Sequence, residues 1–276
     1  MRAVRYTRNA GESRIGRLED DHVVDAGPAG AAGFDASPHA WEHVAAAAGP
    51  AVALADARLL HPVSPGKLIG IGLNYRDHAA ESDLAIPEVP VLFAKFTSAM
   101  VGPGTPIVIP REETRPDYEG EVAVVIGRRT YRADAAAARA AVGGISAMND
   151  VSGRRAQLET PLRQFTLGKS FDTFAPMGPC IASADGIDLE SVGVRTTVSG
   201  EVRQDSSTQN LIFSIVELIA YCSAGMTLEP GDVIATGTPG GVGDSRTPPR
   251  YLRDGDVCEV WVEGVGTLRN PVAFEP

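Results

Sequence analysis

Residues 119–126 constrain the fold of this 276-residue chain more than any other segment. Positions 122–126 are all apolar, so the strand that they predict must be buried on both of its faces. Because strand side chains alternate between faces, Glu119 and Glu121 point the same way, with Cα atoms about 6.5–7 Å apart. Two carboxylates at the start of a buried strand cost several kcal/mol unless a partner compensates them. The segment therefore predicts a shared cation, with a solvated strand face as the alternative.

The remaining sequence predicts an α+β fold that is rich in strands. Its 30 Gly and 20 Pro residues divide the chain into short segments, which suit strands and turns better than a helical bundle. Strands and helices do not alternate regularly, so we expect a rolled or barrel-like sheet. Helices are predicted over residues 40–48, 74–84, 134–142 and 210–223, with a shorter one that ends near residue 159. Asp134 is the expected N-cap of the third of these helices.

The chain is predicted to divide into a small N-terminal module, residues 1–64, and a larger domain, residues 65–276. The module contains short strand candidates around Gly-rich turns, but it gathers no catalytic side chains. We therefore expect it to act as a lid or a packing module, and we expect the functional residues in the larger domain.

Charge and cysteine content argue against several classes of protein. The chain has 25 Lys and Arg against 35 Asp and Glu, a formal net charge of −10, which argues against nucleic acid as the main partner. Its three cysteines form no CxxC pair, so a cysteine zinc site is not expected, and their small, odd number fits a reducing cytosol. We find neither a secretory signal nor an apolar run long enough to span a membrane, so a cytoplasmic protein is expected.

A third acid, Asp150, follows the next buried strand candidate, residues 145–148. Together with Glu119 and Glu121 it would form a cation site made of oxygen ligands alone, which selects Mg²⁺ or Mn²⁺ over zinc. As an alternative, Asp150 caps the N-terminus of the helix that follows. Both roles can coexist on different oxygens of the carboxylate.

The polar helix at residues 74–84 carries a histidine and an acid three positions apart. This spacing places His78 and Glu81 on one face of the helix. A carboxylate beside an imidazole fixes its tautomer and stabilises its protonated form, which suits a general base. The alternative is an ion pair on the protein surface.

Further polar residues are candidates for contact with a substrate. Arg154 and Gln157 lie about one helical turn apart, and Lys169 is a cation inside an apolar stretch. Together with a metal they could clamp a substrate carboxylate, whereas a surface salt bridge explains each of them separately. The run 236–241, Thr-Gly-Thr-Pro-Gly-Gly, follows a strand and offers backbone N–H groups, with a tight turn as the alternative.

Two short runs are similar to nucleotide-binding motifs but lack an essential glycine. The run 168–170 ends like a P-loop, but Arg163 occupies the place of the first glycine of that motif. The run 70–75 begins like a dinucleotide fingerprint, but Tyr75 stands at the third glycine position. A nucleotide-binding function is therefore not expected.

Five motifs in register resemble the fumarylacetoacetate hydrolase family, over about residues 67–272. They are GLNYRDHAAE at 72–81, DYEGE at 117–121, NDVSGRRAQ at 149–157, KSFD at 169–172 and TGTPGG at 236–241. The short leading module is similar to that of bacterial members with a single catalytic module. The resemblance implies a mixed β-roll or β-sandwich fold and a homodimer.

The resemblance also assigns roles to individual residues. It implies His78 and Glu81 as a catalytic pair on a lid over the substrate, with Lys169 as a third catalytic group. The implied ligands of Mg²⁺ or Mn²⁺ are Glu119, Glu121 and Asp150. The implied substrate-binding residues are Tyr75, Arg154, Gln157, Gly237 and Thr238.

On this basis we expect a metal-dependent hydrolase that cleaves a carbon–carbon bond in an acylpyruvate-like or fumarylpyruvate-like 2,4-dioxo acid, in aromatic catabolism. His78 would deprotonate a water that attacks C4, and the metal and Lys169 would stabilise the pyruvate enolate that leaves. The same site would also serve an oxaloacetate decarboxylase or a 2-oxo-enoate isomerase, because both reactions form the same enolate. An alternative of another class is a ligand-binding protein of this fold without catalytic activity.

Overall fold

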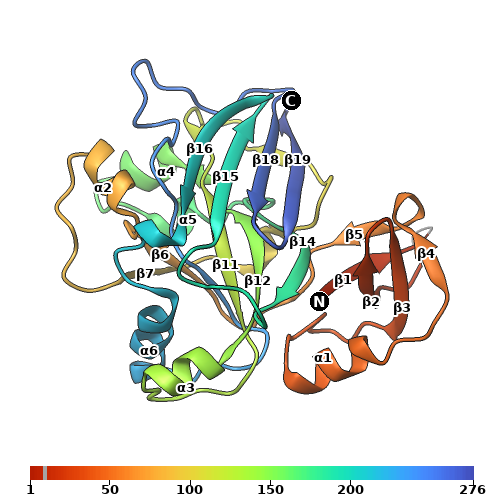
Figure 1. Ribbon diagram of the computed structural model, residues 1–276. Helices are drawn as coiled ribbons and strands as arrows, with labels where there is room; N and C mark the ends of the chain where they lie inside the picture. The colour runs from red at the N-terminus through yellow and green to blue at the C-terminus, as the bar shows by residue number, and fades with distance from the viewer. Residues whose placement is uncertain (9–10) are drawn as a thin grey trace.

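Two β-sheets packed against each other form the framework of the molecule (Figure 1). The structure is a computed structural model, and it describes residues 1–8 and 11–276. Side chains from both sheets meet in one hydrophobic core, and helices lie around the ends of the larger sheet. The expected strand-rich α+β fold is thereby confirmed.

The larger sheet contains twelve strands, ten of them in one continuous order. Those ten are β4 (Ala51–Ala53), β3 (His22–Pro28), β2 (Arg14–Glu19), β1 (Arg2–Thr7), β14 (Ala175–Ser183), β12 (Val142–Asn149), β11 (Gly120–Ile126), β17 (Val233–Ala235), β6 (Leu68–Gly72) and β7 (Val91–Ala94). The other two are β5 (Arg58–Leu60), which pairs with β1, and β8 (Met100–Val101), which pairs with β14. Most neighbouring strands are antiparallel, but β17 and β6 run parallel, so the sheet is mixed.

The smaller sheet has five strands, and a separate ribbon has two. The five are β16 (Glu201–Ser207), β15 (Gly193–Val198), β18 (Val257–Val262), β19 (Gly266–Phe274) and β9 (Ile107–Ile109), and the ribbon pairs β10 (Pro116–Asp117) with β13 (Ser152–Gly153). The α-helices are α1 (Pro38–Ala45), α2 (Arg76–Glu81), α3 (Ala135–Ala140), α4 (Arg154–Leu158), α5 (Phe165–Gly168) and α6 (Ile215–Gly225). Short 3₁₀ helices are η1 (Leu54–Asp56), η2 (Thr97–Ala99) and η3 (Thr208–Asn210).

Strand β11 lies near the centre of the larger sheet, between β12 and β17. All seven of its residues are buried, as the run of apolar side chains predicts. Its first residue, Gly120, faces the smaller sheet so closely that an added Cβ would lie 1.9 Å from the Thr196 hydroxyl oxygen. Only glycine fits between the sheets at this crossing, and the side chains on either side of it point the other way.

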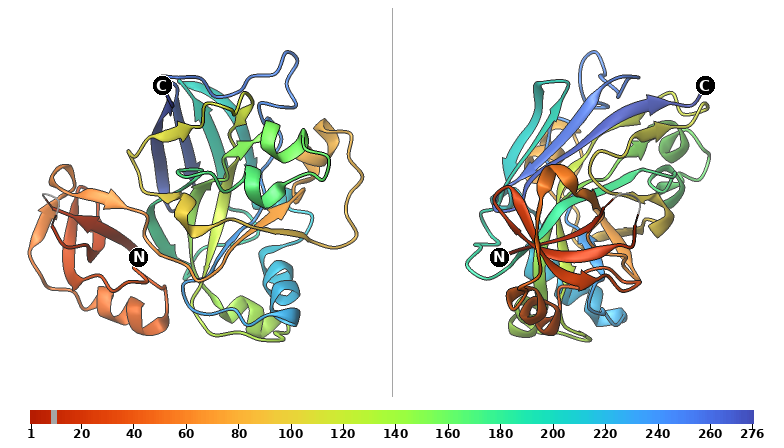
Figure 2. Two further views of the ribbon diagram at one scale, coloured as in Figure 1. Left: turned by 180° about the vertical axis from the view of Figure 1, so that it is seen from behind. Right: turned by 90° about the vertical axis from the view of Figure 1, so that its right-hand side faces the viewer.

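The described residues among the first 64 form β1–β5, α1 and η1 at one side of the molecule (Figures 1 and 2). The larger sheet continues from them into the rest of the chain, because β1 pairs with β14 through Arg2↔Ala182 and Ala3↔Ile181. The division of the chain after residue 64 stays a prediction.

The helices are shorter than their sequence patterns predict. Asp134 caps α3 as expected, and its side chain accepts a hydrogen bond from the Ala137 N–H. The helix predicted over residues 210–223 is wrong at its start, because α6 begins only after Ser214. Ser214 and Glu217 form a reciprocal capping box, which fixes the first turn of α6 at that point.

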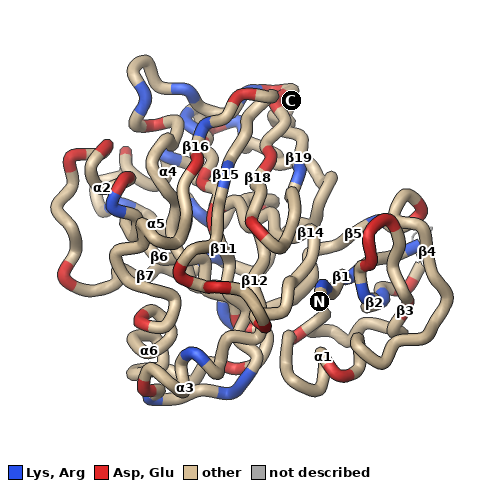
Figure 3. Tube along the Cα trace, in the orientation of Figure 1, with Lys and Arg blue, Asp and Glu red and all other residues tan. Residues whose placement is uncertain are grey.

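No helix in the described part of the chain is long and apolar enough to span a bilayer. Positions of Lys and Arg are scattered among those of Asp and Glu along the whole trace (Figure 3).

Buried Tyr6 and Asp25, together with half-buried Arg14, form a polar cluster that links three strands of the N-terminal region. The Tyr6 hydroxyl donates to Asp25 Oδ1 at 2.6 Å, and Arg14 Nε donates to the same oxygen at 2.7 Å. These hydrogen bonds, that of Arg14 above all, lower the pKa of Asp25 to about 2. A carboxyl whose pKa is lower in the folded state stabilises the fold above its unfolded pKa, and this contribution is lost as the pH falls through the folded value.

Replacing Tyr6 with phenylalanine is expected to lower the free energy of unfolding by about 1–2 kcal/mol at neutral pH, because it removes a hydrogen bond to a charged group. The variant should also lose less stability than the wild type between pH 4 and about pH 2, since the pKa of Asp25 is then depressed less. Urea unfolding at neutral pH and between pH 4 and about pH 2 measures both effects, with the exposed Tyr221→Phe as control. Identical pH profiles in wild type and Tyr6→Phe would refute the role of the cluster.

Candidate active site

A cavity of about 530 Å³ collects most of the residues that the sequence singles out. Residues of α2, α4 and α5 contribute to its wall. Its buried floor includes Glu119, Arg154, Gln157, Lys169 and Thr238. His78 and Glu81 of α2 also line it. All five motifs, from distant parts of the sequence, therefore meet in one place.

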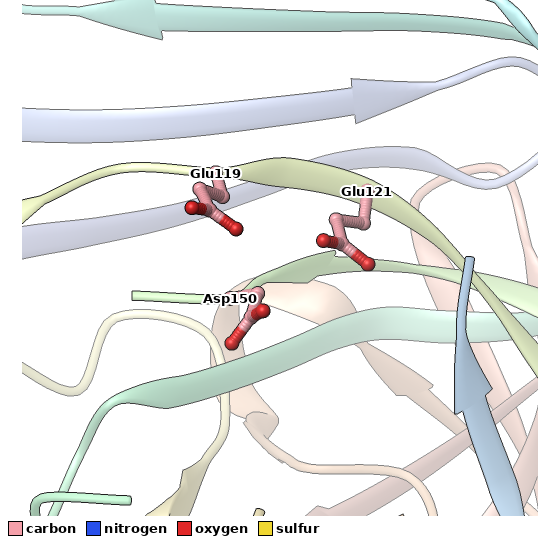
Figure 4. A group of neighbouring side chains, drawn as sticks. All are labelled: Glu119, Glu121 and Asp150. Carbon is pink, nitrogen blue, oxygen red and sulfur yellow. The ribbon is translucent and has the colours of Figure 1, made fainter. Parts of the chain in front are cut away.

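Glu119, Glu121 and Asp150 converge beside this cavity (Figure 4). One carboxylate oxygen from each lies within 4.8 Å of those from the other two, and all three residues are buried. The pairing of β11 with β12 produces this arrangement, since Gly120 lies opposite Asn149. The Asp150 N–H also donates to the Glu119 carbonyl at 2.8 Å. The solvated strand face considered for the glutamates is therefore wrong.

Buried cations compensate part of this negative charge. Lys169 Nζ lies 2.5 Å from Glu119 and 2.7 Å from Asp150, and Lys95 Nζ lies 2.5 Å from the second oxygen of Asp150. Burial acts to raise the pKa of Glu119, but Lys169 and Arg154 outweigh it, so this pKa lies well below its usual value. Lys169 and Arg154 are thus buried ion-pair partners, and the surface salt bridges considered for them are wrong.

Glu121 lacks such compensation. The one hydrogen bond that its carboxylate accepts from the described residues comes from the Gly237 N–H, at 2.9 Å. Burial, and then the charges of Asp150 and Glu119, raise its pKa well above the usual value. The three carboxylates thus offer hard oxygen ligands, and the charge of Glu121 is left without a cationic partner among the described residues. Both features fit a divalent cation bound by oxygen ligands.

The alternative role of Asp150 as a helix cap is wrong. Helix α4 begins at Arg154, and its N-cap is Gly153, which has no side chain to form a cap. The carboxylate of Asp150 instead faces Lys95 and Lys169.

His78 and Glu81 form the close pair that their spacing predicts. His78 Nδ1 and Glu81 Oε1 are 2.8 Å apart, and the side chains are 15% and 26% exposed. The Gly241 N–H donates to the other oxygen of Glu81 at 2.7 Å. Because Nδ1–H donates to Glu81, Nε2 is left as the hydrogen-bond acceptor of the ring. Both residues line the cavity, unlike an ordinary surface ion pair.

The loop at residues 236–241 links Glu121 of the acid cluster to Glu81 of the His78–Glu81 pair. Its backbone N–H groups are used within the protein, since Gly237 donates to Glu121 and Gly241 donates to Glu81. Thr238 lines the cavity, and its hydroxyl donates to the Gly120 carbonyl at 3.0 Å. The loop therefore holds the expected cation site and the His78–Glu81 pair in a fixed relation.

Two residues expected to contact substrate do not line the cavity. Gly237 lies behind it, next to Glu121. Tyr75 is fully buried, and its hydroxyl has no hydrogen-bond partner among the described residues. Burial, and then the charges of Glu121 and Asp77, raise the pKa of Tyr75. Contacts of these two residues with substrate stay predictions.

The structure adds three polar residues that the sequence reading does not single out. Asp117 is fully buried and accepts hydrogen bonds from Arg154 Nε and NH2 at 3.0 and 2.8 Å. Lys95 faces Asp150, and it follows strand β7 as a lone cation inside an apolar stretch, the same signal that drew attention to Lys169. Gln204 has no comparable signal in the sequence.

Gln204 of β16 joins the two sheets beneath the loop at residues 236–241. Its Oε1 accepts from the Gly120 N–H at 2.9 Å, and its Nε2 donates to the Thr238 hydroxyl at 2.7 Å and to the Pro239 carbonyl at 2.8 Å. Gln204→Leu leaves these buried groups unpaired and is expected to cost about 2 kcal/mol of unfolding free energy. Chemical denaturation measures it, with the exposed Gln209→Leu as control. A loss below about 0.5 kcal/mol would contradict this role.

Comparison with known proteins places these residues in a wider context. Residues 67–273 match the sequence model described as fumarylacetoacetate (FAA) hydrolase C-terminal. A mitochondrial oxaloacetate tautomerase of Xenopus laevis is 43% identical over 216 residues, which cover 78% of this chain and 68% of the relative.

Two solved structures are similar to the whole chain. The fumarylacetoacetate hydrolase of Exiguobacterium antarcticum has a TM-score of 0.84 and 38% identity, and each chain is fully covered. The 5-carboxymethyl-2-hydroxymuconate delta-isomerase of Mycobacterium smegmatis has a TM-score of 0.83 and 37% identity, again with full coverage of both chains.

Proposed function

Because the chain belongs to the fumarylacetoacetate hydrolase family, we propose that it is an enzyme that transfers a proton at C3 of a 2-oxo acid and so interconverts its keto and enol forms. A divalent cation, Mg²⁺ or Mn²⁺, would be bound by Glu119, Glu121 and Asp150. The names of two relatives, an oxaloacetate tautomerase and a delta-isomerase, support proton transfer over carbon–carbon cleavage.

One observation carries this proposal. The His78–Glu81 pair lines the same cavity as Glu119, one of the three clustered acids, and a single loop holds both groups through the Gly241 and Gly237 N–H groups. Enolisation of a 2-oxo acid requires a base that removes the C3 proton. It also requires positive charge near the C2 oxygen, because negative charge develops there.

Three residues of the chain have separate roles in this proton transfer. His78 Nε2 accepts the proton from C3, and Glu81 stabilises the imidazolium that forms. Lys169 places an ammonium beside the site, which stabilises the negative charge of the enolate. Return of the proton from Nε2 to the C2 oxygen gives the enol and restores His78, and the reverse sequence gives the keto acid. A bound divalent cation would supply further positive charge for the 1-carboxylate and the 2-oxo group of the substrate.

The floor of the cavity suits the carboxylate end of the substrate. Gln157 Oε1 accepts from Arg154 NH1 at 3.1 Å, so the amide N–H groups of Gln157 are directed elsewhere and are available to a substrate oxygen. Arg154 keeps its positive charge, since Glu119 and Asp117 outweigh burial and raise its pKa. We propose that these two residues orient the acid so that C3 lies next to His78.

A second candidate is hydrolysis of a 2,4-dioxo acid. The structural similarity to a fumarylacetoacetate hydrolase favours it. In that reaction His78 would take a proton from water instead of from C3, the hydroxide would add to C4, and the C3–C4 bond would break to release pyruvate enolate.

A panel of substrates separates the two reactions. The enol of oxaloacetate is followed by its ultraviolet absorbance, and acetylpyruvate is analysed for pyruvate and acetate, each with Mg²⁺ and with EDTA. We expect metal-dependent conversion of the enol and little cleavage of acetylpyruvate. Faster cleavage than tautomerisation would establish the hydrolase, and binding of 2-oxo acids with no turnover would establish a ligand-binding protein.

A further inference from the structure

We propose that Arg163 binds a second carboxylate at the far end of the substrate, so that the enzyme selects 2-oxo dicarboxylic acids. The inference rests on the proposed function, because it concerns the end of the 2-oxo acid that does not react. It assigns a specificity-determining role to an arginine that lines the cavity and that none of the five family motifs contains.

The charges that line the cavity single out this residue. Arg154 forms ion pairs with Asp117 and Glu119, at 2.8 and 2.7 Å. Lys169 forms ion pairs with Glu119 and Asp150. Within residues 1–8 and 11–276, Arg163 is the cation of the cavity wall that has no acidic partner.

The acids near the opening are already engaged, so they do not neutralise Arg163. Glu81 is held by His78 and by the Gly241 N–H. Asp244 accepts from Arg115 NH2 at 2.6 Å and from the Tyr251 hydroxyl at 2.5 Å. An incoming anion is therefore the available partner for the guanidinium.

Its position suits the far end of a ligand. Arg163 is exposed and lies in the loop between α4 and α5, whereas Glu119, Arg154 and Lys169 are buried at the floor. The Gln164 N–H donates to the Gln157 carbonyl at 3.0 Å, which ties this loop to the helix that carries Gln157 of the floor. A chain whose first carboxylate lies at the floor thus extends toward Arg163.

The surroundings of Arg163 favour selection by charge. Leu84, Leu158 and Phe165 also line the cavity, and their side chains offer no hydrogen bonds to a polar end group. The backbone of Arg163 has a φ of 45°, in the left-handed region that glycine or asparagine adopts at lower cost. A guanidinium placed among apolar side chains binds a carboxylate through paired N–H groups.

The test compares each acid with its methyl ester, which lacks the negative charge at the far end. The substrates are the enols of oxaloacetate and of its 4-methyl ester, and a second pair is 2-oxopentanedioate and its 5-methyl ester. The ratio of kcat/KM for acid over ester is measured in wild type, Arg163→Gln and Arg163→Lys. Arg155→Gln is the matched control, because Arg155 is an exposed arginine of α4 that does not line the cavity.

We expect the wild type to prefer at least one acid over its ester about tenfold or more, as a hydrogen-bonded charge pair allows. In Arg163→Gln this ratio falls close to one, mainly through KM, and in Arg163→Lys part of it returns. Arg155→Gln keeps the ratio of the wild type. An unchanged ratio in Arg163→Gln, or no preference for either acid in the wild type, would overturn the inference.

Calorimetric binding of the same four compounds in the presence of Mg²⁺ separates this inference from the proposed function. Tighter binding of the acid in wild type but not in Arg163→Gln supports the role of Arg163 even if no compound is turned over, and the proposed function alone then fails. Equal binding of acid and ester, or no binding of either, contradicts the inference.

Discussion

Replacing His78 with glutamine is expected to lower kcat for tautomerisation by about 10²–10⁴-fold, the usual contribution of a general base. Glutamine cannot take up a proton at the position of Nε2, although its amide can still form a hydrogen bond with Glu81 at the present 2.8 Å contact. The loss should fall on kcat more than on KM, because proton transfer occurs in the transition state. Steady-state kinetics of the oxaloacetate enol with saturating Mg²⁺ measures it.

The control for this variant is His39→Gln, which changes an exposed histidine of α1 outside the cavity. Its kinetic constants should equal those of the wild type. Both variants should unfold at the wild-type temperature and bind the metal equally. A kcat of His78→Gln within threefold of the wild-type value would exclude His78 as the base.

Replacing Glu121 with glutamine is expected to have opposite effects on the metal-free and the metal-bound protein. Without metal, the variant should be as stable as the wild type or more so, because a neutral amide replaces a buried carboxylate beside two others. The pKa of Glu121 is raised in the folded state, so the metal-free wild type loses stability as the pH rises above the ordinary glutamate pKa of about 4.3, and the variant does not.

With metal, the order should reverse. A cation that binds only the folded wild type adds about 2.7 kcal/mol to its free energy of unfolding at a concentration of 100 times Kd, and the variant should gain little. Thermal unfolding with and without Mg²⁺ or Mn²⁺ measures this, with Glu259→Gln on β18 as control. Equal stabilisation of wild type and Glu121→Gln by the metal would place the cation elsewhere.

The sequence predicts most reliably those features that a local pattern determines. The unbroken apolar run after Glu121 requires a strand buried on both faces, and that strand is β11. The alternation of side chains along it brings Glu119 and Glu121 together, and the i, i+3 spacing does the same for His78 and Glu81.

Features that depend on packing between distant segments cannot be predicted from one sequence. From the sequence Asp150 could be a helix cap or a ligand, and only the fold excludes the cap, because α4 begins at Arg154 and the carboxylate of Asp150 faces Lys95 and Lys169. The ion pairs of Arg154 cannot be predicted from the sequence either, because its partner Asp117 lies 37 residues away in the chain.

The start of α6 shows the same limit at a smaller scale. An apolar stripe with helical spacing runs through residues 210–223, but the capping box at Ser214 decides where the helix begins. Hydrophobic periodicity therefore locates a helix more reliably than it locates its ends.

The central claim is that His78 and a cation held by the three acids act together in one site to move the C3 proton of a 2-oxo acid. Proton NMR of oxaloacetate in D₂O measures this directly, as the rate at which the C3 hydrogens exchange with solvent above the rate with Mg²⁺ alone. We predict exchange that requires the enzyme, Mg²⁺ and His78 together, without breakage of the carbon chain. Exchange no faster than the Mg²⁺ background, or equally fast with EDTA or with His78→Gln, would contradict the account.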